Sequence, residues 1–213
     1  MFSSVRRFKQ LDNDFVVINV NSDQWVNDND NISVKTASFG FGMHIMAPVI
    51  GKHTLICFAA GAGFSANNLY TNGYPQLDSI GATHLDLFPD SISYSNNKII
   101  ANYFEIPLEL RYRTIPDNKG RSFKLNVGVK GGYLFQSHTK YDGDEFRPGK
   151  PNEQVKFKEY RIKNLLNYRY GPYIRIGYGK MSVSASYTMT NLFVENKGPV
   201  FRYYSIGLSI IPI

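Results

Sequence analysis

The residues of this chain most able to do chemistry are the charged side chains that alternate with apolar ones between residues 102 and 114. Glu105, Glu109, Arg111 and Arg113 fall on odd positions, and the even positions from 104 to 112 are all apolar or aromatic. This period of two predicts a β-strand with one charged face and one apolar face, because a helix would need apolar residues three and four apart. Charges gathered on one face can bind or conduct ions, or pair with one another.

The other candidates for catalysis or metal binding form no recognisable site. The four histidines, at 44, 53, 84 and 138, lack the spacing of zinc ligands, and the acidic runs at 28–31 and 142–145 lack the order of an EF-hand. Ser38 and His44 share one face of a predicted strand, but no acidic partner can be named for a catalytic site at the rim. We therefore expect no catalytic residue, no metal and no cofactor, and a packing role for Cys57.

The charged residues must be positioned by a series of alternating segments. Eight such segments follow one another without a convincing helix, at 15–21, 38–47, 54–65, 102–114, 123–133, 168–178, 182–190 and 204–210. The connections after the second, fourth and sixth are short, and the others are longer. Short periplasmic turns and long external loops are typical of outer-membrane barrels. The predicted fold is an all-β, eight-stranded antiparallel up-and-down transmembrane β-barrel, with external loops at 66–97 and 137–165.

Aromatic residues frame the apolar faces at spacings of eight to ten positions. Eight residues of tilted strand rise roughly 20 Å, close to the apolar band of about 25 Å between the aromatic girdles of outer-membrane barrels. We therefore predict a lipid-facing girdle formed by Phe104, Tyr112, Phe123, Tyr133, Tyr170 and Tyr178.

If the apolar faces meet lipid, the charged faces fill the lumen. Eight strands leave an interior wide enough only for side chains or one small ligand. Buried charges must be paired, since desolvation costs several kcal/mol per ion, so we favour a side-chain plug over a binding or conduction site. Pro107 and Pro172 are expected at bulges, because each removes a ladder donor. The predicted lumenal charge network consists of Glu105, Glu109, Arg111, Arg113, Lys124, Lys130, Arg169 and Arg175.

Composition agrees with a single barrel and excludes other classes. The chain has 213 residues and one cysteine, which fits one domain and rules out a disulfide scaffold. No apolar run is long enough for a membrane helix. The net charge of +7 is spread along the chain, so no nucleic-acid partner is expected. We predict a flexible periplasmic N-terminus at 1–12 and one outer-membrane domain at 13–213. No signal peptide is visible, so its prior removal is expected.

Several motifs point to a known family. They are FGFGMHI near residue 40, AAGAGFS at 59–65, YFEIPLELRYR at 103–113, LNVGVKGGYLF at 125–135, YRYGPYIRIGYG at 168–179 and the ending SIGLSIIPI. With them the chain resembles the PorT-like outer-membrane β-barrel proteins of the Bacteroidetes type. The resemblance implies an eight-stranded barrel with no catalytic residues to carry over. Some relatives serve protein secretion or gliding machinery.

The expected function is a non-enzymatic, porin-like barrel surrounded by outer-membrane lipid. We expect it to act as a structural or partner-binding component, for example of a secretion or envelope assembly, with a protein partner held by loops 66–97 and 137–165. One alternative is a lipocalin-like barrel that binds a small apolar ligand, which requires the apolar faces to point inward. Another is a channel for small solutes through the basic lumen, against which the small strand number argues.

Overall fold

The structure, a computed structural model, describes residues 15–27, 32, 34–35, 38–147 and 153–212. No helix in these ranges is long and apolar enough to cross a membrane. The strands are β1 (Val16–Asn27), β2 (Phe39–Ile50), β3 (Ile56–Tyr70), β4 (Gly73–Leu77), β5 (Thr83–Leu87), β6 (Tyr94–Arg113), β7 (Phe123–Asp144), β8 (Gln154–Tyr160), β9 (Tyr168–Tyr178), β10 (Met181–Tyr187) and β11 (Phe201–Ile210).

Eight of these strands close into an antiparallel barrel. Each pairs with the next along the circuit β1, β2, β3, β6, β7, β9, β10 and β11, and β11 returns to β1 from Ile18 opposite Ile210 to Asn27 opposite Phe201. The remaining described strands stand outside this circuit, because β4 and β5 form a separate hairpin and β8 pairs only with the far part of β7. The predicted up-and-down barrel is confirmed.

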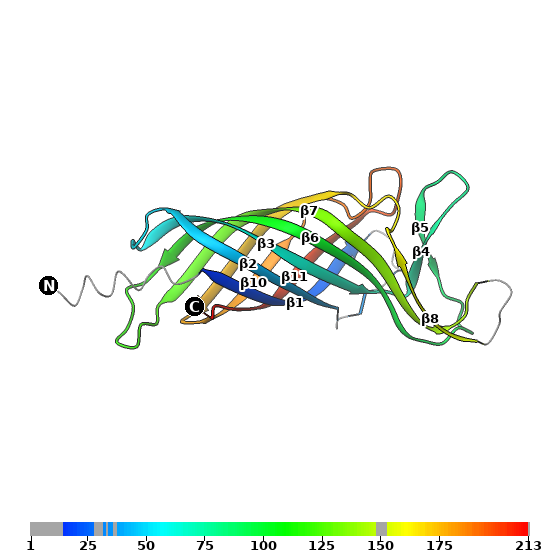
Figure 1. Cartoon of the computed structure of the whole chain (residues 1–213), viewed down its shortest axis with the longest axis horizontal. Helices are drawn as coiled ribbons and strands as arrows, with labels where there is room; N and C mark the ends of the chain where they lie inside the picture. The colour runs from blue at the N-terminus through cyan, green and yellow to red at the C-terminus, as the bar shows by residue number, and fades with distance from the viewer. Residues whose placement is uncertain (1–14, 28–31, 33, 36–37, 148–152, 213) are drawn as a thin grey trace.

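The two ends of the barrel differ in the length of their connections. The tight turns β2–β3, β6–β7 and β9–β10 lie at the end where β1 starts and β11 finishes, on the left of Figure 1. The β4–β5 hairpin and the β7–β8 hairpin lie at the opposite end, on the right. The expected flexible segment 1–12 lies outside the described residues.

The connections at the external end are long, as predicted, but they are not irregular loops. Much of 66–97 and 137–165 is strand: β3 continues to Tyr70, β6 begins at Tyr94, β7 runs to Asp144, and β4, β5 and β8 are additional. Asn, Asp and Gly disfavour strands in isolation, but pairing with neighbours and packing against them override that preference. Likewise β1 extends through Trp25, which was expected in a loop, and β10 ends at Tyr187 rather than at residue 190.

The two prolines do not lie at bulges. Pro107 stands opposite Lys130, and Pro172 opposite Val129, without a shift of register at either position. Instead, the ladder between β6 and β3 is interrupted from Ala60–Leu108 to Gly63–Glu105, and the ladder between β9 and β10 ends at Tyr173. Each proline therefore lies where one neighbouring ladder has no pairing, so its missing N–H donor is tolerated.

The apolar faces point outward and the charged faces point inward. On β6, Phe104, Ile106 and Leu110 are 59%, 63% and 56% exposed, while Glu105 and Glu109 are 1% and 3% exposed. The lipocalin-like alternative needed the opposite arrangement, so it is wrong. This apolar outer surface runs around the full circuit of strands. Such a surface requires a hydrocarbon environment.

Candidate functional site

The first group of charges in the lumen, the Glu105 cluster, joins Glu105 of β6 to His44, Lys130 and Arg169 of β2, β7 and β9. One carboxylate oxygen of Glu105 lies 2.6 Å from Arg169 and 3.5 Å from Lys130 Nζ. The other lies 2.8 Å from His44 Nε2. Asn19 Nδ2 approaches His44 Nδ1 at 3.3 Å, so the Nε2 proton faces the carboxylate. Both oxygens of a fully buried carboxylate are thus compensated.

Asp23 of β1 extends this cluster across the lumen. Arg169 donates to Asn67 Oδ1 at 2.7 Å, and Asn67 donates to one oxygen of Asp23 at 2.7 Å. Ser205 donates to the other oxygen at 2.5 Å. Asp23 is fully buried, and Asn67 connects it to Arg169. Sequence reasoning missed Asp23 because it ended the first strand at residue 21, although Asn19, Asn21 and Asp23 keep the period of two.

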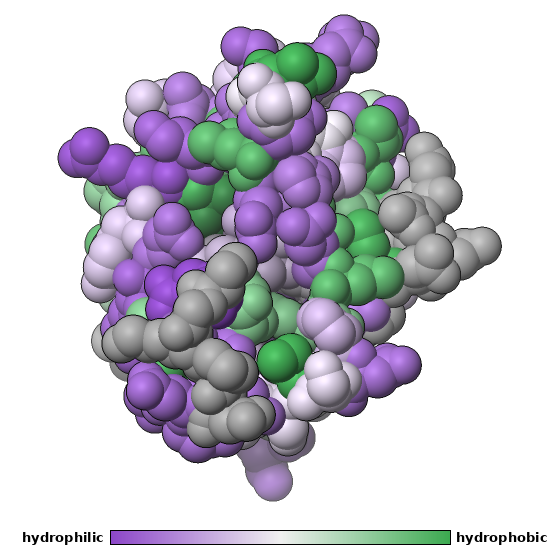
Figure 2. Space-filling view, turned by 90° about the vertical axis from the view of Figure 1, so that its right-hand side faces the viewer, coloured by the Kyte–Doolittle hydropathy of each residue, from purple (hydrophilic) through white to green (hydrophobic). Residues whose placement is uncertain are grey.

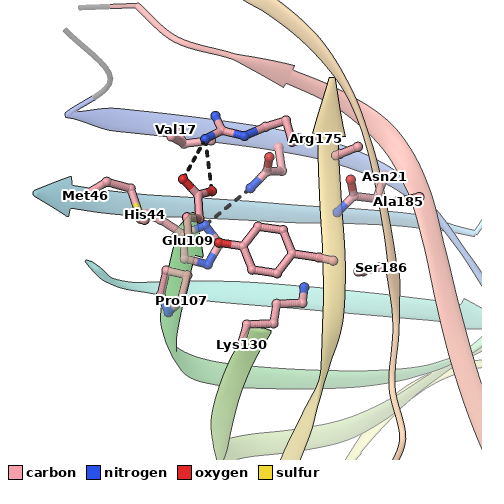
Figure 3. Close-up of a pocket in the computed structure, with 13 residues that line it drawn as sticks. Val17, Asn21, His44, Met46, Pro107, Glu109, Lys130, Arg175, Ala185 and Ser186 are labelled. Carbon is pink, nitrogen blue, oxygen red and sulfur yellow. Dashed lines mark hydrogen bonds and ion pairs between the residues drawn. The ribbon is translucent and has the colours of Figure 1, made fainter. Parts of the chain in front are cut away.

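The second group, the Glu109 cluster, lies nearer the short turns. Arg175 of β9 is 3.0 and 3.1 Å from the two oxygens of Glu109, and Arg111 donates to Glu109 at 2.7 Å. A cavity of about 50 Å³ adjoins this cluster, bordered also by His44 and Lys130 (Figure 3). A single ordered water needs about 10–15 Å³ of such space. The cavity therefore has room for a few waters but not for a solute.

All eight predicted network residues line the interior, at three levels. Glu105, Lys130 and Arg169 belong to the Glu105 cluster, and Glu109, Arg111 and Arg175 form the Glu109 cluster. Arg113 and Lys124 stand directly opposite each other on β6 and β7, further toward the short turns, and both are buried.

Apolar side chains share the lumen with these charges. At the external end, Trp25 stacks on Phe201 with ring centroids 4.3 Å apart, over a larger buried cluster. In the half nearer the short turns, Val17, Met46, Ala59 and Ile211 pack together. These apolar layers were not anticipated from the sequence. The external cluster consists of Ile32, Leu69, Leu85, Ile99, Leu165, Leu192, Phe193 and Phe201.

The six predicted girdle aromatics all lie on the outer surface, at two levels of the barrel. Phe123 is directly opposite Tyr178 near the short turns, and Phe104 is directly opposite Tyr133 toward the external end. Phe104 also contacts Phe135, with ring centroids 4.5 Å apart. Exposure ranges from 42% for Phe123 to 61% for Tyr133. The remaining two, Tyr112 and Tyr170, are exposed at the lower and upper level respectively.

The histidines and acidic runs remain scattered in the structure. Among the described residues, no group of three or more His, Cys, Asp or Glu side chains is placed to hold a metal ion. Ser38 bonds the backbone of Lys35 and Tyr70 instead of His44. In the run 142–145, Asp142 pairs with Lys156 and Glu145 with Arg147. The run 28–31 lies outside the described residues.

The external end carries a groove between the two hairpins. It has a volume of about 580 Å³ and is lined by 74–77 and Thr83 on one side and by parts of 139–163 on the other. Polar surface dominates the end-on view, interrupted by separate apolar patches (Figure 2). The Tyr74 hydroxyl contacts Glu159, and burial together with that carboxylate raises the pKa of Tyr74. An aromatic cluster lies behind the groove: Tyr74, Phe88, Tyr94, Tyr141, Phe146 and Phe157.

Comparison with known families identifies this architecture. The profile of the outer membrane protein beta-barrel domain family matches residues 12–197. The chain belongs to this family. As an outer-membrane barrel, it resides in the bacterial outer membrane with its short turns toward the periplasm and its hairpins outside.

Other comparisons add little to the outer-membrane assignment. No curated protein matches the chain. Among solved structures, the attachment invasion locus protein Ail of Yersinia pestis, in complex with the heparin analogue sucrose octasulfate, shares 10% identity with it. The alignment covers 92% of this chain and 95% of that one, with a TM-score of 0.37. A likeness this weak supports no inference about what this barrel binds.

Proposed function

We propose that this chain is a non-enzymatic outer-membrane barrel that binds a protein partner through its two external hairpins. The observation that carries the proposal is the groove of about 580 Å³ formed jointly by the β4–β5 hairpin and the β7–β8 hairpin. Most of its lining residues belong to β4, β5, β7 and β8, so much of the surface is presented in a fixed shape. Pre-ordered surfaces lose less entropy when a partner binds.

The chemistry of the groove suits an extended, acidic segment of a partner. Tyr74, Phe146 and Phe157 supply aromatic surface, and Arg161 and Lys163 supply positive charge. Aromatic residues and arginine are the side chains most often responsible for binding energy at interfaces. β8 pairs only with β7 and is an edge strand of the sheet. An edge strand can accept an added strand from a partner through main-chain hydrogen bonds.

A photo-crosslinking experiment in intact cells tests this proposal. A crosslinking amino acid at Gln76, which lines the groove, should give a discrete protein adduct, and the same residue at Lys119 in the β6–β7 turn should not. The double variant Arg161→Glu/Lys163→Glu should abolish the Gln76 adduct, while Lys52→Glu/Lys119→Glu should keep it. Identical adducts at both positions, or none at Gln76, would refute partner binding through the groove.

A more specific assignment of the protein's cellular role rests on the sequence resemblance alone. We propose that the barrel is PorT-like and serves a secretion or envelope assembly, because of EIPL at 105–108 and GVKGGYLF at 128–135. A deletion strain should show a reduced set of secreted proteins, restored by the wild-type gene and not by the Arg161→Glu/Lys163→Glu variant. Unchanged secretion would refute the secretory role and leave partner binding to be judged by crosslinking.

We also propose that the lumen is plugged by its own side chains. The paired charges of the Glu105 and Glu109 clusters and the two apolar clusters inside the barrel support this proposal. Purified protein in planar lipid bilayers should therefore show no stepwise conductance. Reproducible single-channel steps would instead favour the channel alternative.

A further inference from the structure

Three lysines form a row on the flank of the barrel, separate from the lumen. Lys98 of β6 stands directly opposite Lys140 of β7, which stands directly opposite Lys158 of β8. Directly opposite residues of antiparallel strands have Cβ atoms about 5 Å apart and point to the same face. The three lysine side chains therefore start side by side on one face, and like charges directly opposite each other are destabilising.

This lysine row (Lys98, Lys140 and Lys158) lies on the same outer surface as the upper aromatic girdle. On β6, Lys98 and Phe104 are an even number of residues apart, so both point away from the lumen. On β7, the neighbours of Lys140 in sequence, Thr139 and Tyr141, are buried on the inner side. The row therefore stands on the lipid-facing flank, beyond the girdle in the external direction.

The row carries positive charge without a carboxylate to neutralise it. Lys98 Nζ contacts only neutral groups among the described residues, Asn68 Oδ1 at 3.1 Å and the Tyr70 hydroxyl at 3.4 Å. Within the same ranges, Lys140 and Lys158 make no ion pair. Asp142 lies two residues beyond Lys140 on the same face of β7, but it forms an ion pair with Lys156 at 2.7 Å.

A histidine, His138, lies beside the row, and the lysine charges affect its pKa. His138 lies two residues before Lys140 on the same face, and its ring is 5.3 Å from that of Tyr160. Partial burial, together with Lys158 and Lys98, lowers the pKa of His138. The histidine is therefore neutral at pH 7, and the flank presents the three lysine charges.

The height of the row identifies the kind of anion that can reach it. Six residues of strand at about 3.3 Å each, tilted by about 40°, place Lys98 roughly 15 Å beyond the ring of Phe104. Lysine side chains can bend back toward the membrane interface. This is the level of the phosphorylated sugar headgroups of the outer leaflet, above its hydrocarbon layer.

The position on the flank also argues against other occupants. Lys158 also borders the hairpin groove, whereas Lys98 and Lys140 do not, so a soluble partner in the groove would reach one lysine of the row and not all three. A second copy of the chain, related by a two-fold axis, would bring its own lysine row against this one. Like charges placed opposite each other disfavour such a dimer.

We propose that Lys98, Lys140 and Lys158 form a binding site for the phosphate groups of outer-leaflet lipopolysaccharide. The three ammonium groups bind phosphates of the headgroup, while the girdle aromatics below them contact its acyl chains. The site anchors one glycolipid molecule at the β6–β7–β8 flank and holds the β7–β8 hairpin at a defined height above the membrane.

The test compares lipid binding by the full-length protein in neutral phosphatidylcholine nanodiscs. The probe is bisphosphorylated lipid A, with the same lipid lacking its phosphates as the reference. The variant is Lys98→Gln/Lys140→Gln/Lys158→Gln, and the matched control is Lys52→Gln/Lys119→Gln/Lys180→Gln, which removes the same charge at the short turns. Heat-modifiable gel migration verifies that each variant is folded.

A lysine near an anionic membrane surface contributes about fivefold to affinity. The lysine-row variant should therefore bind bisphosphorylated lipid A on the order of a hundredfold more weakly than wild type, and the control should stay within about twofold. Wild type should bind the dephosphorylated lipid as weakly as the variant does.

Three outcomes would overturn the proposal. They are unchanged binding by the lysine-row variant, equal binding of the phosphorylated and dephosphorylated lipids, and equal losses in the variant and the control. Soluble tripolyphosphate serves as a further arm. If it binds the row while lipid A does not, the row is a site for soluble polyanions and the membrane proposal fails.

Discussion

Glu105 shows at the scale of one residue how the charged interior is held together. It contacts Arg169, Lys130 and His44 and is almost fully buried. Glu105→Gln leaves two cations in the lumen without their carboxylate, so it should lower the free energy of unfolding by about 3–5 kcal/mol. Urea unfolding in phospholipid vesicles, followed by the fluorescence of Trp25, measures this.

The control for Glu105→Gln is Glu195→Gln, which removes the same charge from an exposed position between β10 and β11. It should change the free energy of unfolding by less than about 0.5 kcal/mol. If the two variants were equally stable, Glu105 would not be the centre of its cluster.

Asp117, in the periplasmic β6–β7 turn, gives a residue-scale prediction for pH. The backbone N–H of Arg121 at 2.8 Å, the Arg121 side chain and the Tyr178 hydroxyl lower the pKa of Asp117 to about 2. Because the pKa is lower in the folded state, its contribution to stability is present above about pH 4 and is lost as the pH falls toward 2. The urea midpoint of wild type should fall across this window more steeply than that of Asp117→Asn. Parallel curves would contradict this.

At the scale of elements, the β7–β8 hairpin supports the β4–β5 hairpin. Tyr74 of β4 docks there through its hydroxyl, 3.2 Å from Thr139, and through its ring against Phe146 and Phe157. Tyr74→Ala removes all of these contacts and should cost about 3 kcal/mol locally. Hydrogen exchange in 73–87 should become on the order of a hundred times faster, while the barrel strands keep their protection.

The matched control for Tyr74→Ala is Tyr160→Ala, on the exposed outer face of β8. It should leave exchange in 73–87 unchanged, because Tyr160 borders the groove but takes no part in the contacts that Tyr74 makes with Thr139, Phe146 and Phe157. If exchange rates rose equally in both variants, the hairpin would not depend on Tyr74.

For the whole molecule, the decisive physical property is an outer surface of apolar side chains around the entire circuit of strands. Leu108 lies midway between Phe104 and Tyr112 on the outward face of β6. Leu108→Arg should therefore lower the free energy of unfolding in vesicles by about 2–4 kcal/mol, the cost of a cation at mid-membrane. Ile80→Arg, at a highly exposed position between β4 and β5, should cost almost nothing. Equal effects would be inconsistent with a membrane-spanning β6.

The amino-acid sequence by itself determined the fold class, the order of the strands and which face of each strand points outward. Side chains alternate along a strand whatever its partner, so a period of two can be recognised without knowing the pairing. For the same reason the eight candidate lumenal charges could be selected as one set, and the six girdle aromatics as another.

Only the tertiary structure decided which residues meet. Arg169 reaches Glu105 and Asn67 across the closed barrel, and Asp23 joins them from β1; these contacts depend on strand register and closure. The shift of register near Asn102 leaves Phe135 as an extra residue on β7. This bulge reverses the alternation beyond it, so Lys140 points outward into the lysine row, whereas the parity of 123–133 places it inside. A local alternation pattern cannot reveal such a reversal, because the pairing of β6 with β7 creates it.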